Sequence, residues 1–369
     1  MKIIFAGGGT MGHITPSLAI AQSIKAKNKN SEILFINRSS ESENKRIQNA
    51  GFDVREIEIS GFSRKLNIKN LKNLYITIKA VSQAKKMIKD FLPDVVFATG
   101  GYVSFPVLYS AQRLSIPTVI HESNATPGLV TKLLYKKCNK VLLNYPGSDK
   151  FFGKNKNVLV VGTPVKEAFI KTDRETARKK LGIKKDEILI ASFGGSGGSS
   201  KMNDTIIEIL KNHSSITNGI KHIHACGKKY YSEIAKQYPE LVKKGKSTKI
   251  VDYIENMPEV ITASDIVITR CGAVTLSEIS ASGAVGILIP SPNVTDNHQY
   301  KNAKFFSDAN AGLLIEEENL SERTLLDAIR CLETNSIKRK EISENAKSLY
   351  NFNSKDLIIN ELQKLALKD

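Results

Sequence analysis

KIIFAGGGTMGHITPSLAIAQSI, residues 2–24, is the stretch that decides the fold. A short apolar run enters a glycine turn and a helical pattern follows, which is how a parallel α/β domain begins. The pattern starts again with ILIASFGGSGGSSKMNDTIIEIL, residues 188–210. Two such starts predict two Rossmann-like domains, each with a parallel sheet and a ligand site at the carboxyl ends of its strands.

Short apolar segments that alternate with helical patterns recur along the chain. Those of the first half are residues 2–6, 32–37, 54–59, 94–100, 118–122 and 141–145. Those of the second half are 187–195, 221–227, 249–254, 265–270 and 285–290. Gly162, Thr163 and Pro164 interrupt the alternation, and we place the inter-domain hinge there. The predicted division is therefore 1–163, 164–341 and a C-terminal helical segment, 342–369, that packs on either domain, with the N-terminal domain as one option.

Composition restricts the class of protein. A chain of 369 residues with 41% hydrophobic and 25% charged residues is expected to be a soluble protein of two domains. No apolar run has the length of a membrane span, and the N-terminus does not read as a signal peptide. The four cysteines are scattered, which predicts no disulfide or metal framework and favours a cytoplasmic setting. The net charge of +17 suits nucleic acid, an anionic membrane or phosphorylated substrates, or reflects a lysine-rich composition.

The opening loop has the glycine spacing of a dinucleotide-binding turn. Thr15 and Pro16 are typical of a helix start, so we expect a loop from Gly7 to Ile14 whose N–H groups suit a pyrophosphate. A dinucleotide site also needs an acidic residue at the end of the second strand, and Asn37-Arg38 stands there, which argues against a redox cofactor.

His13 directly follows the last glycine of that loop. It is either a histidine hydrogen-bonded to the backbone or a general base beside a phosphate site.

A second glycine loop, GGSGGSS at residues 194–200, follows the first strand of the second half. Its glycines let the backbone approach a phosphate, and its serines add hydroxyl donors. The Lys-Ser pair of an ATPase does not follow, so an ATPase is excluded.

Two further polar motifs follow strands of the second half. Thr275 and Glu278 have the spacing of a capping box, or else present a hydroxyl to phosphate and a carboxylate to a ribose. His298 and Gln299 lie in DNHQYKNA, which is either a polar helix start or a set of side chains for sugar hydroxyls.

On the first half, Tyr102, Glu122 and Asn124 follow strands and are expected at the same sheet edge as His13. The chain has no Asp-x-Asp triplet, which argues against a metal-chelated sugar nucleotide.

Taken in order, these motifs resemble the MurG family of bacterial N-acetylglucosaminyltransferases, which convert lipid I to lipid II in peptidoglycan synthesis. The resemblance covers essentially the whole chain and rests on GGTMGHITPSLA, ATGGYVSFP, IHESNATPG, GTPVK, FGGSGGSS, TRCGAVTLSEI and DNHQYKNA. It implies a GT-B fold, with a lipid-acceptor domain before a UDP-GlcNAc domain and a cleft between them. It also implies an inverting transfer to the 4-hydroxyl of the acceptor.

The resemblance also implies roles for single residues. His13 is the first candidate for the general base and Glu122 the second. The acceptor or the donor sugar is expected near Thr10, Gly12, Tyr102 and Asn124. The residues expected to bind UDP-GlcNAc are Lys166, Ser196, Ile254, Ala273, Val274, Thr275, Glu278, His298 and Gln299. No metal ligand and no cofactor are expected, since UDP-GlcNAc is a co-substrate and a divalent cation is not essential.

The basic residues of segment 62–91 point to an anionic membrane as a partner. This segment combines the apolar residues Leu66, Ile68, Leu71, Leu74, Tyr75 and Ile78 with the basic residues Arg64, Lys65, Lys69, Lys72 and Lys79. Such a segment either packs as an ordinary amphipathic helix or lies on an anionic leaflet.

The expected partners are therefore UDP-GlcNAc, lipid I, an anionic membrane surface and proteins of cell-wall synthesis, but not nucleic acid. The expected location is peripheral, on the cytoplasmic face of the cell membrane. Another GT-B glycolipid glycosyltransferase, a UDP-GlcNAc 2-epimerase and a non-catalytic basic protein remain as alternatives.

Overall fold

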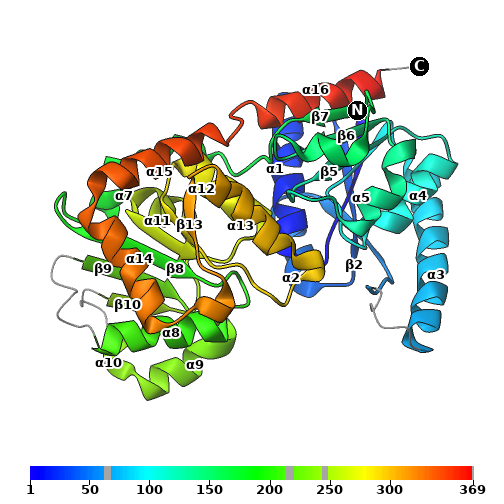
Figure 1. The fold of residues 1–369 in the computed structure, drawn as a ribbon. Helices are drawn as coiled ribbons and strands as arrows, with labels where there is room; N and C mark the ends of the chain where they lie inside the picture. Colours follow the sequence, from blue (N-terminus) through cyan, green and yellow to red (C-terminus); the bar gives the residue numbers. More distant parts are fainter. Residues whose placement is uncertain (62–67, 213–219, 243–247, 368–369) are drawn as a thin grey trace. The chain divides into compact units, whose positions relative to one another are not determined.

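The computed structural model describes residues 1–61, 68–212, 220–242 and 248–367. The chain divides into two compact units, which we name unit 1 (Met1–Val165 with Asn351–Asp369) and unit 2 (Lys166–Tyr350). Each unit has its own sheet and its own core (Figure 1). The predicted α/β class with two parallel sheets is confirmed.

Unit 1 is built on a 7-stranded parallel sheet of order β3-β2-β1-β4-β5-β6-β7. Its strands are β1 (Lys2–Ala6), β2 (Glu32–Arg38), β3 (Asp53–Ile57), β4 (Val95–Ala98), β5 (Thr118–Glu122), β6 (Lys140–Leu143) and β7 (Val158–Val160). Its helices are α1 (Met11–Lys27), α2 (Glu41–Asn49), α3 (Ile68–Phe91), α4 (Ser104–Arg113), α5 (Leu129–Leu134), η1 (Tyr135–Lys137), η2 (Ser148–Phe152) and α16 (Ser354–Ala366).

Unit 2 repeats this plan with a 6-stranded sheet of order β10-β9-β8-β11-β12-β13. Its strands are β8 (Ile188–Phe193), β9 (Ile220–Ala225), β10 (Thr248–Val251), β11 (Ile266–Thr269), β12 (Gly286–Leu288) and β13 (Gly312–Leu314). Its first helices are α6 (Ala168–Lys171), α7 (Arg174–Leu181), α8 (Ser200–Asn212), α9 (Lys228–Gln237), α10 (Pro239–Val242) and α11 (Met257–Ala263). The others are α12 (Ala273–Ser282), η3 (Thr295–Asn297), α13 (His298–Asp308), η4 (Glu317–Asn319), α14 (Glu322–Thr334) and α15 (Ser336–Ser348).

The central strands, such as β1 and β4, are apolar because helices cover both faces of each sheet. In β1, Ile3 and Phe5 belong to the core cluster that contains α1 and α16. Ile4 and Ala6 alternate with them and belong to the cluster of α3, α4 and α5. Since neighbouring side chains of a strand point to opposite faces, a continuous apolar run is what a doubly covered parallel strand requires.

The C-terminal segment divides between the two units. Helix α15 belongs to unit 2, where Ile342 joins the core and the Ser343 hydroxyl donates to the Gly283 carbonyl at 2.6 Å. Helix α16 lies against α1 in unit 1, where Ile358 and Leu362 are buried in the core (Figure 1). The boundary in this part of the chain is therefore at Asn351 and not at Ile342.

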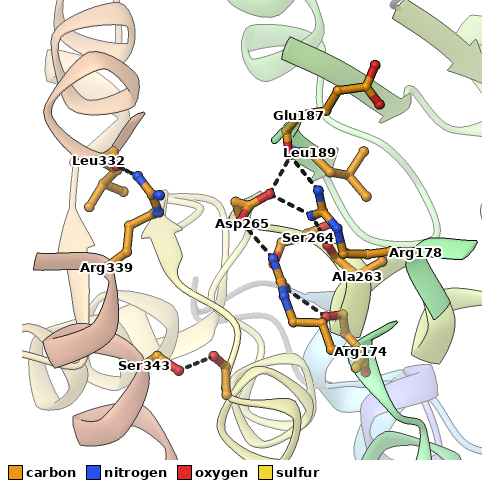
Figure 2. Close-up of polar contacts among 12 residues, drawn as sticks. Arg174, Arg178, Glu187, Leu189, Ala263, Ser264, Asp265, Leu332, Arg339 and Ser343 are labelled. Carbon is orange, nitrogen blue, oxygen red and sulfur yellow. Dashed lines mark hydrogen bonds and ion pairs between the residues drawn. The ribbon is translucent and has the colours of Figure 1, made fainter. Parts of the chain in front are cut away.

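A partly buried ion cluster joins α7 to the start of β11, at the amino ends of the unit 2 strands (Figure 2). Asp265 Oδ1 accepts from Arg174 Nη2 at 2.7 Å, and Oδ2 accepts from Arg178 Nη1 at 3.0 Å. Both guanidinium groups also donate to the last carbonyls of α11, those of Thr262, Ala263 and Ser264. Positive charge at a helix C-terminus is favourable, so the cluster fastens α11 to the sheet.

A second buried network lies on the middle strands of unit 2. The Ser192 hydroxyl lies 2.7 Å from His222 Nε2 and 2.8 Å from His224 Nδ1. Burial and the neighbouring His224 lower the pKa of His222 to about 3, and burial lowers the pKa of His224 to about 4. Both rings are therefore neutral in the folded protein near neutral pH.

Acidification is expected to destabilise the protein through these two histidines. Their ordinary pKa is 6.5, so below that pH the unfolded chain binds more protons than the folded chain, and stability falls as the pH falls toward about 4. Replacing His222 by Gln should reduce the slope of unfolding free energy against pH by roughly 1.4 kcal/mol per pH unit. Urea unfolding followed by circular dichroism between pH 6 and pH 5 measures the slope, and an unchanged slope would contradict the assignment.

Candidate active site

Both sheets have a point where the strand order reverses, between β1 and β4 in unit 1 and between β8 and β11 in unit 2. Parallel α/β sheets bind ligands at the carboxyl ends of the strands beside such a point. The predicted motifs follow these strands, so each unit carries its own set of candidate site residues.

The first helix begins earlier than predicted. Thr10 is extended (φ −153°, ψ 156°) and precedes α1, which starts at Met11 and contains Pro16. The prediction that Thr15 starts the helix is therefore wrong. The fixed φ of proline is compatible with a helix, so Pro16 costs one hydrogen bond without ending it. His13 consequently lies in the first helical turn and not in a loop.

The His13 ring is oriented by β4. Its Nδ1 lies 2.7 Å from the Thr99 carbonyl oxygen. A carbonyl only accepts, so Nδ1 carries the hydrogen, and in the neutral ring Nε2 holds the lone pair. The ring lies against Gly101 (φ +76°), where an added Cβ would stand 3.1 Å from Nε2. The first alternative for His13, a ring hydrogen-bonded to the backbone, is therefore observed. The same bond selects the tautomer that a general base would need.

Glu43 is a loop anchor that the sequence did not reveal. It comes from α2 and is buried, and its carboxylate accepts from the Gly9 N–H at 3.2 Å and from Arg38 Nη2 at 2.9 Å. Burial opposes its ionisation, but hydrogen bonds from Arg38, Asn37 and the loop outweigh burial and lower the pKa of Glu43. The acid near the end of β2 therefore fixes the glycine loop, which counts further against a dinucleotide ribose there.

Tyr102 and Asn124 flank the same edge of unit 1. The Tyr102 ring packs on Gly9 (φ +89°), where an added Cβ would lie 2.9 Å from Cε1. The Asn124 amide donates to Glu122 Oε1 at 3.0 Å. Thr10 and Gly12 are exposed at the start of α1.

The Glu122 carboxylate organises its own loop. It is buried and accepts from the backbone of Asn124 at 3.1 Å, from the Gly128 N–H at 2.9 Å and from the Thr131 hydroxyl at 2.7 Å. A carboxylate that holds so many donors is less suited to take a proton from a substrate than the His13 ring.

In unit 2 the glycine loop leads into the N-terminus of α8. Gly198 has φ +72°, and an added Cβ would lie 2.2 Å from the Cys226 carbonyl oxygen, so only glycine fits. Ser196 is exposed at the tip of this loop. The N-terminus of α8, with its positive dipole end, therefore lies beside an exposed hydroxyl, as an anion site requires.

Thr275 and Glu278 both lie inside α12, which begins at Ala273 after Gly272. Thr275 is thus the third helical residue and does not cap the helix, which excludes the capping-box alternative. One turn apart, both side chains lie on one helix face and are partly exposed, whereas Ala273 and Val274 are buried.

His298 and Gln299 start α13 and are fixed by backbone groups. Gln299 Oε1 accepts from the Cys271 N–H at 3.2 Å and from the Ser291 N–H at 2.9 Å, so its amide hydrogens remain as donors. His298 Nδ1 lies 2.7 Å from the Thr295 carbonyl oxygen, which leaves Nε2 as an acceptor.

The remaining two predicted residues are at the margins of unit 2. Ile254 follows β10 and its side chain is buried, so only its backbone groups are suited to contact a nucleobase. Lys166 is exposed at the first position of the unit.

Among known protein families, one model matches each half of the chain. The glycosyltransferase family 28 N-terminal domain matches residues 3–143, and the glycosyltransferase family 28 C-terminal domain matches residues 189–361. A UDP-N-acetylglucosamine–N-acetylmuramyl-(pentapeptide) pyrophosphoryl-undecaprenol N-acetylglucosamine transferase of Acetivibrio thermocellus is 40% identical over 95% of this chain and 94% of its own length. The protein of the same name from Clostridioides difficile is 35% identical over 99% of this chain and 89% of its own.

Solved structures share the fold. The crystal structure of Acinetobacter baumannii MurG covers 98% of this chain and 99% of its own, with a TM-score of 0.75 and 23% identity. A UDP-GlcNAc 2-epimerase from Neisseria meningitidis, bound to UDP-GlcNAc, covers 99% of this chain and 100% of its own, with a TM-score of 0.67 and 14% identity. At these identities the likeness concerns the fold alone.

Proposed function

The chain belongs to glycosyltransferase family 28 and, within it, to the MurG family, and from this we propose that it moves GlcNAc from UDP-GlcNAc to the lipid-linked MurNAc-pentapeptide of lipid I, which forms lipid II. The near full-length identity to transferases of that name carries the proposal. It also favours a transferase over a 2-epimerase or a non-catalytic basic protein.

The proposed reaction is a direct displacement with inversion. His13 Nε2 takes the proton of the acceptor 4-hydroxyl while that oxygen forms the β-1,4 bond to the anomeric carbon. The bond from that carbon to the diphosphate breaks, and UDP leaves with its electron pair. The dipole of α8 and N–H groups of the loop from Gly195 to Ser200 stabilise the growing negative charge, so the leaving group needs no essential divalent cation. The Gly198 N–H is not among these donors, because it donates to the Gly195 carbonyl.

On the donor side, the proposed contacts follow the geometry of unit 2. The Glu278 carboxylate accepts from the ribose hydroxyls, and Thr275 and Ser196 meet the phosphates. The free donors of Gln299 and the acceptor of His298 suit the hydroxyls of GlcNAc. The proposed contacts to the nucleotide are completed by the backbone of Ile254 and by Lys166, Ala273 and Val274.

Transfer of labelled GlcNAc to a lipid I analogue tests the proposal. We expect product that depends on the analogue and that persists in excess EDTA. Transfer to diacylglycerol instead would indicate another glycolipid glycosyltransferase, and formation of the 2-epimer without acceptor would indicate an epimerase.

Replacing Glu278 by Gln is expected to weaken UDP binding about 10- to 100-fold, because hydrogen bonds to a charged acceptor contribute roughly 1.5–3 kcal/mol. Calorimetric titration with UDP measures the effect. Glu233→Gln, at an exposed position of α9, is the matched control and should bind UDP like the parent. Unchanged UDP affinity in the Glu278 variant would contradict the ribose contact.

Because the acceptor is lipid-linked, we further propose that unit 1 rests on the cytoplasmic face of the membrane. No helix in the described part of the chain is long and apolar enough to cross a bilayer. Arg64, Lys65 and Leu66 of the predicted basic segment lie outside the described residues. On α3, the side chains are described from Asn73 onward. In this helix, Leu74, Tyr75 and Ile78 are 50%, 69% and 62% exposed, which suits contact with lipid.

A Leu74→Ser, Ile78→Ser double variant is expected to bind anionic vesicles roughly 10-fold more weakly, since two apolar side chains no longer enter the interface. Vesicle sedimentation measures binding, and turnover on a water-soluble acceptor analogue should not change. Ile337→Ser, at an exposed position of unit 2, controls for the loss of an apolar side chain. Equal vesicle binding by parent and double variant would remove α3 from the membrane contact.

A further inference from the structure

Arg270, at the end of β11, connects the loops that follow several strands of unit 2. Its Nη1 donates to the carbonyl oxygens of Ile289 at 3.2 Å and Pro290 at 3.1 Å, in the loop after β12. Its Nη2 donates to the Ser199 hydroxyl at 2.6 Å, in the glycine loop after β8. A single guanidinium thus spans three neighbouring strand ends.

Glu317, in η4 after β13, contacts the same Nη2 of this guanidinium that donates to Ser199. Its carboxylate forms an ion pair with Arg270 Nη2. The side chains are only 11% exposed for Arg270 and 18% for Glu317. Without a side-chain acceptor at position 317, the nearly buried Nη2 would lose a hydrogen-bond partner, so the position of Arg270 depends on Glu317.

Ser199 transmits this position to the anion site. It directly precedes α8, and its hydroxyl also accepts from the Met202 N–H at 3.5 Å, in the first turn of the helix. The oxygen that Arg270 holds is therefore part of the loop whose N–H groups face the leaving diphosphate in the proposed reaction.

We propose that Glu317 is a positioning residue for the donor diphosphate: through Arg270 it fixes Ser199 and the glycine loop at the N-terminus of α8. The inference rests on the proposed function, because it takes UDP as the ligand of that loop. Glu317 touches no part of the nucleotide itself and acts only through the guanidinium.

Binding of UDP and of uridine to single variants tests the inference. Removing the acid with Glu317→Ala lets Arg270 and the loop shift, so UDP should bind about 10-fold more weakly, the effect expected for a lost charge-assisted contact. Uridine has no phosphate and should bind as to the parent. Glu317→Gln keeps an acceptor for Arg270 and removes a negative charge near the phosphates, so UDP affinity should be retained or higher.

Glu318→Ala is the matched control, since Glu318 is an exposed acid of the same short helix. Equal UDP affinity of Glu317→Ala and parent would overturn the inference. So would a parallel loss of UDP and uridine binding, which would indicate a general structural defect, or an equal loss in Glu317→Gln. If the parent protein itself bound no UDP, the proposed function would fail instead.

Discussion

Replacing His13 by alanine is expected to lower turnover on a lipid I analogue by about 10²- to 10⁴-fold, the usual contribution of a general base. The Thr99 carbonyl, 2.7 Å from Nδ1, keeps the lone pair on Nε2, and alanine offers no group to take the acceptor proton. Affinity for UDP should not change, because the nucleotide contacts are proposed on unit 2. Steady-state kinetics and a UDP titration on the same preparation measure both quantities.

His13→Asn separates the chemistry of the ring from its packing. The asparagine amide can donate to the Thr99 carbonyl as the imidazole does, but it cannot act as a base near neutral pH. The turnover of the His13→Asn variant should therefore be as slow as that of the His13→Ala variant. Near-parental turnover in either variant would remove His13 from the role of base.

Replacing Asp265 by alanine is expected to lower the free energy of unfolding by about 3–5 kcal/mol, as breaking a buried ion pair does. Asp265 holds Arg174 and Arg178 and also accepts from the Leu189 N–H at 2.8 Å (Figure 2). Without it, both guanidinium groups lose their negatively charged partner, which leaves the buried Arg178 uncompensated, and the Leu189 N–H loses its acceptor. Chemical unfolding followed by circular dichroism measures the loss.

The control for this variant is Asp327→Ala. Asp327 is exposed, and its carboxylate forms only a long ion pair, at 4.0 Å, with Arg323 one turn away on α14. Its removal should therefore change the free energy of unfolding by less than about 0.5 kcal/mol. Because the Asp265 cluster is at the amino ends of the strands, folded Asp265→Ala protein should keep its UDP affinity. Equal stability of the Asp265 and Asp327 variants would contradict the role of the cluster.

The order of strands and helices was predictable because its signals are local. Apolar runs of four to seven residues, glycine turns and helical periodicity mark β1 through β6 and β8 through β12 within short windows of sequence. The strands that were not predicted are β7 (Val158–Val160) and β13 (Gly312–Leu314). The start of α1 was misplaced because Pro16 is tolerated inside the helix, whereas local rules put it at the first position.

The candidate residues could be located by sequence, but not their chemical roles. The glycine loops, Thr275, Glu278 and Gln299 follow strands whose carboxyl ends must meet at one edge of a parallel sheet, so the sequence by itself determined where ligands are expected. Orientation depends on partners far along the chain. Thr99 is 86 residues from His13 and Glu317 is 47 residues from Arg270, and no local pattern pairs them. Only the tertiary structure decides which donor meets which acceptor, because a hydrogen bond requires contact within about 3 Å and the sheet alone sets which strand ends are neighbours.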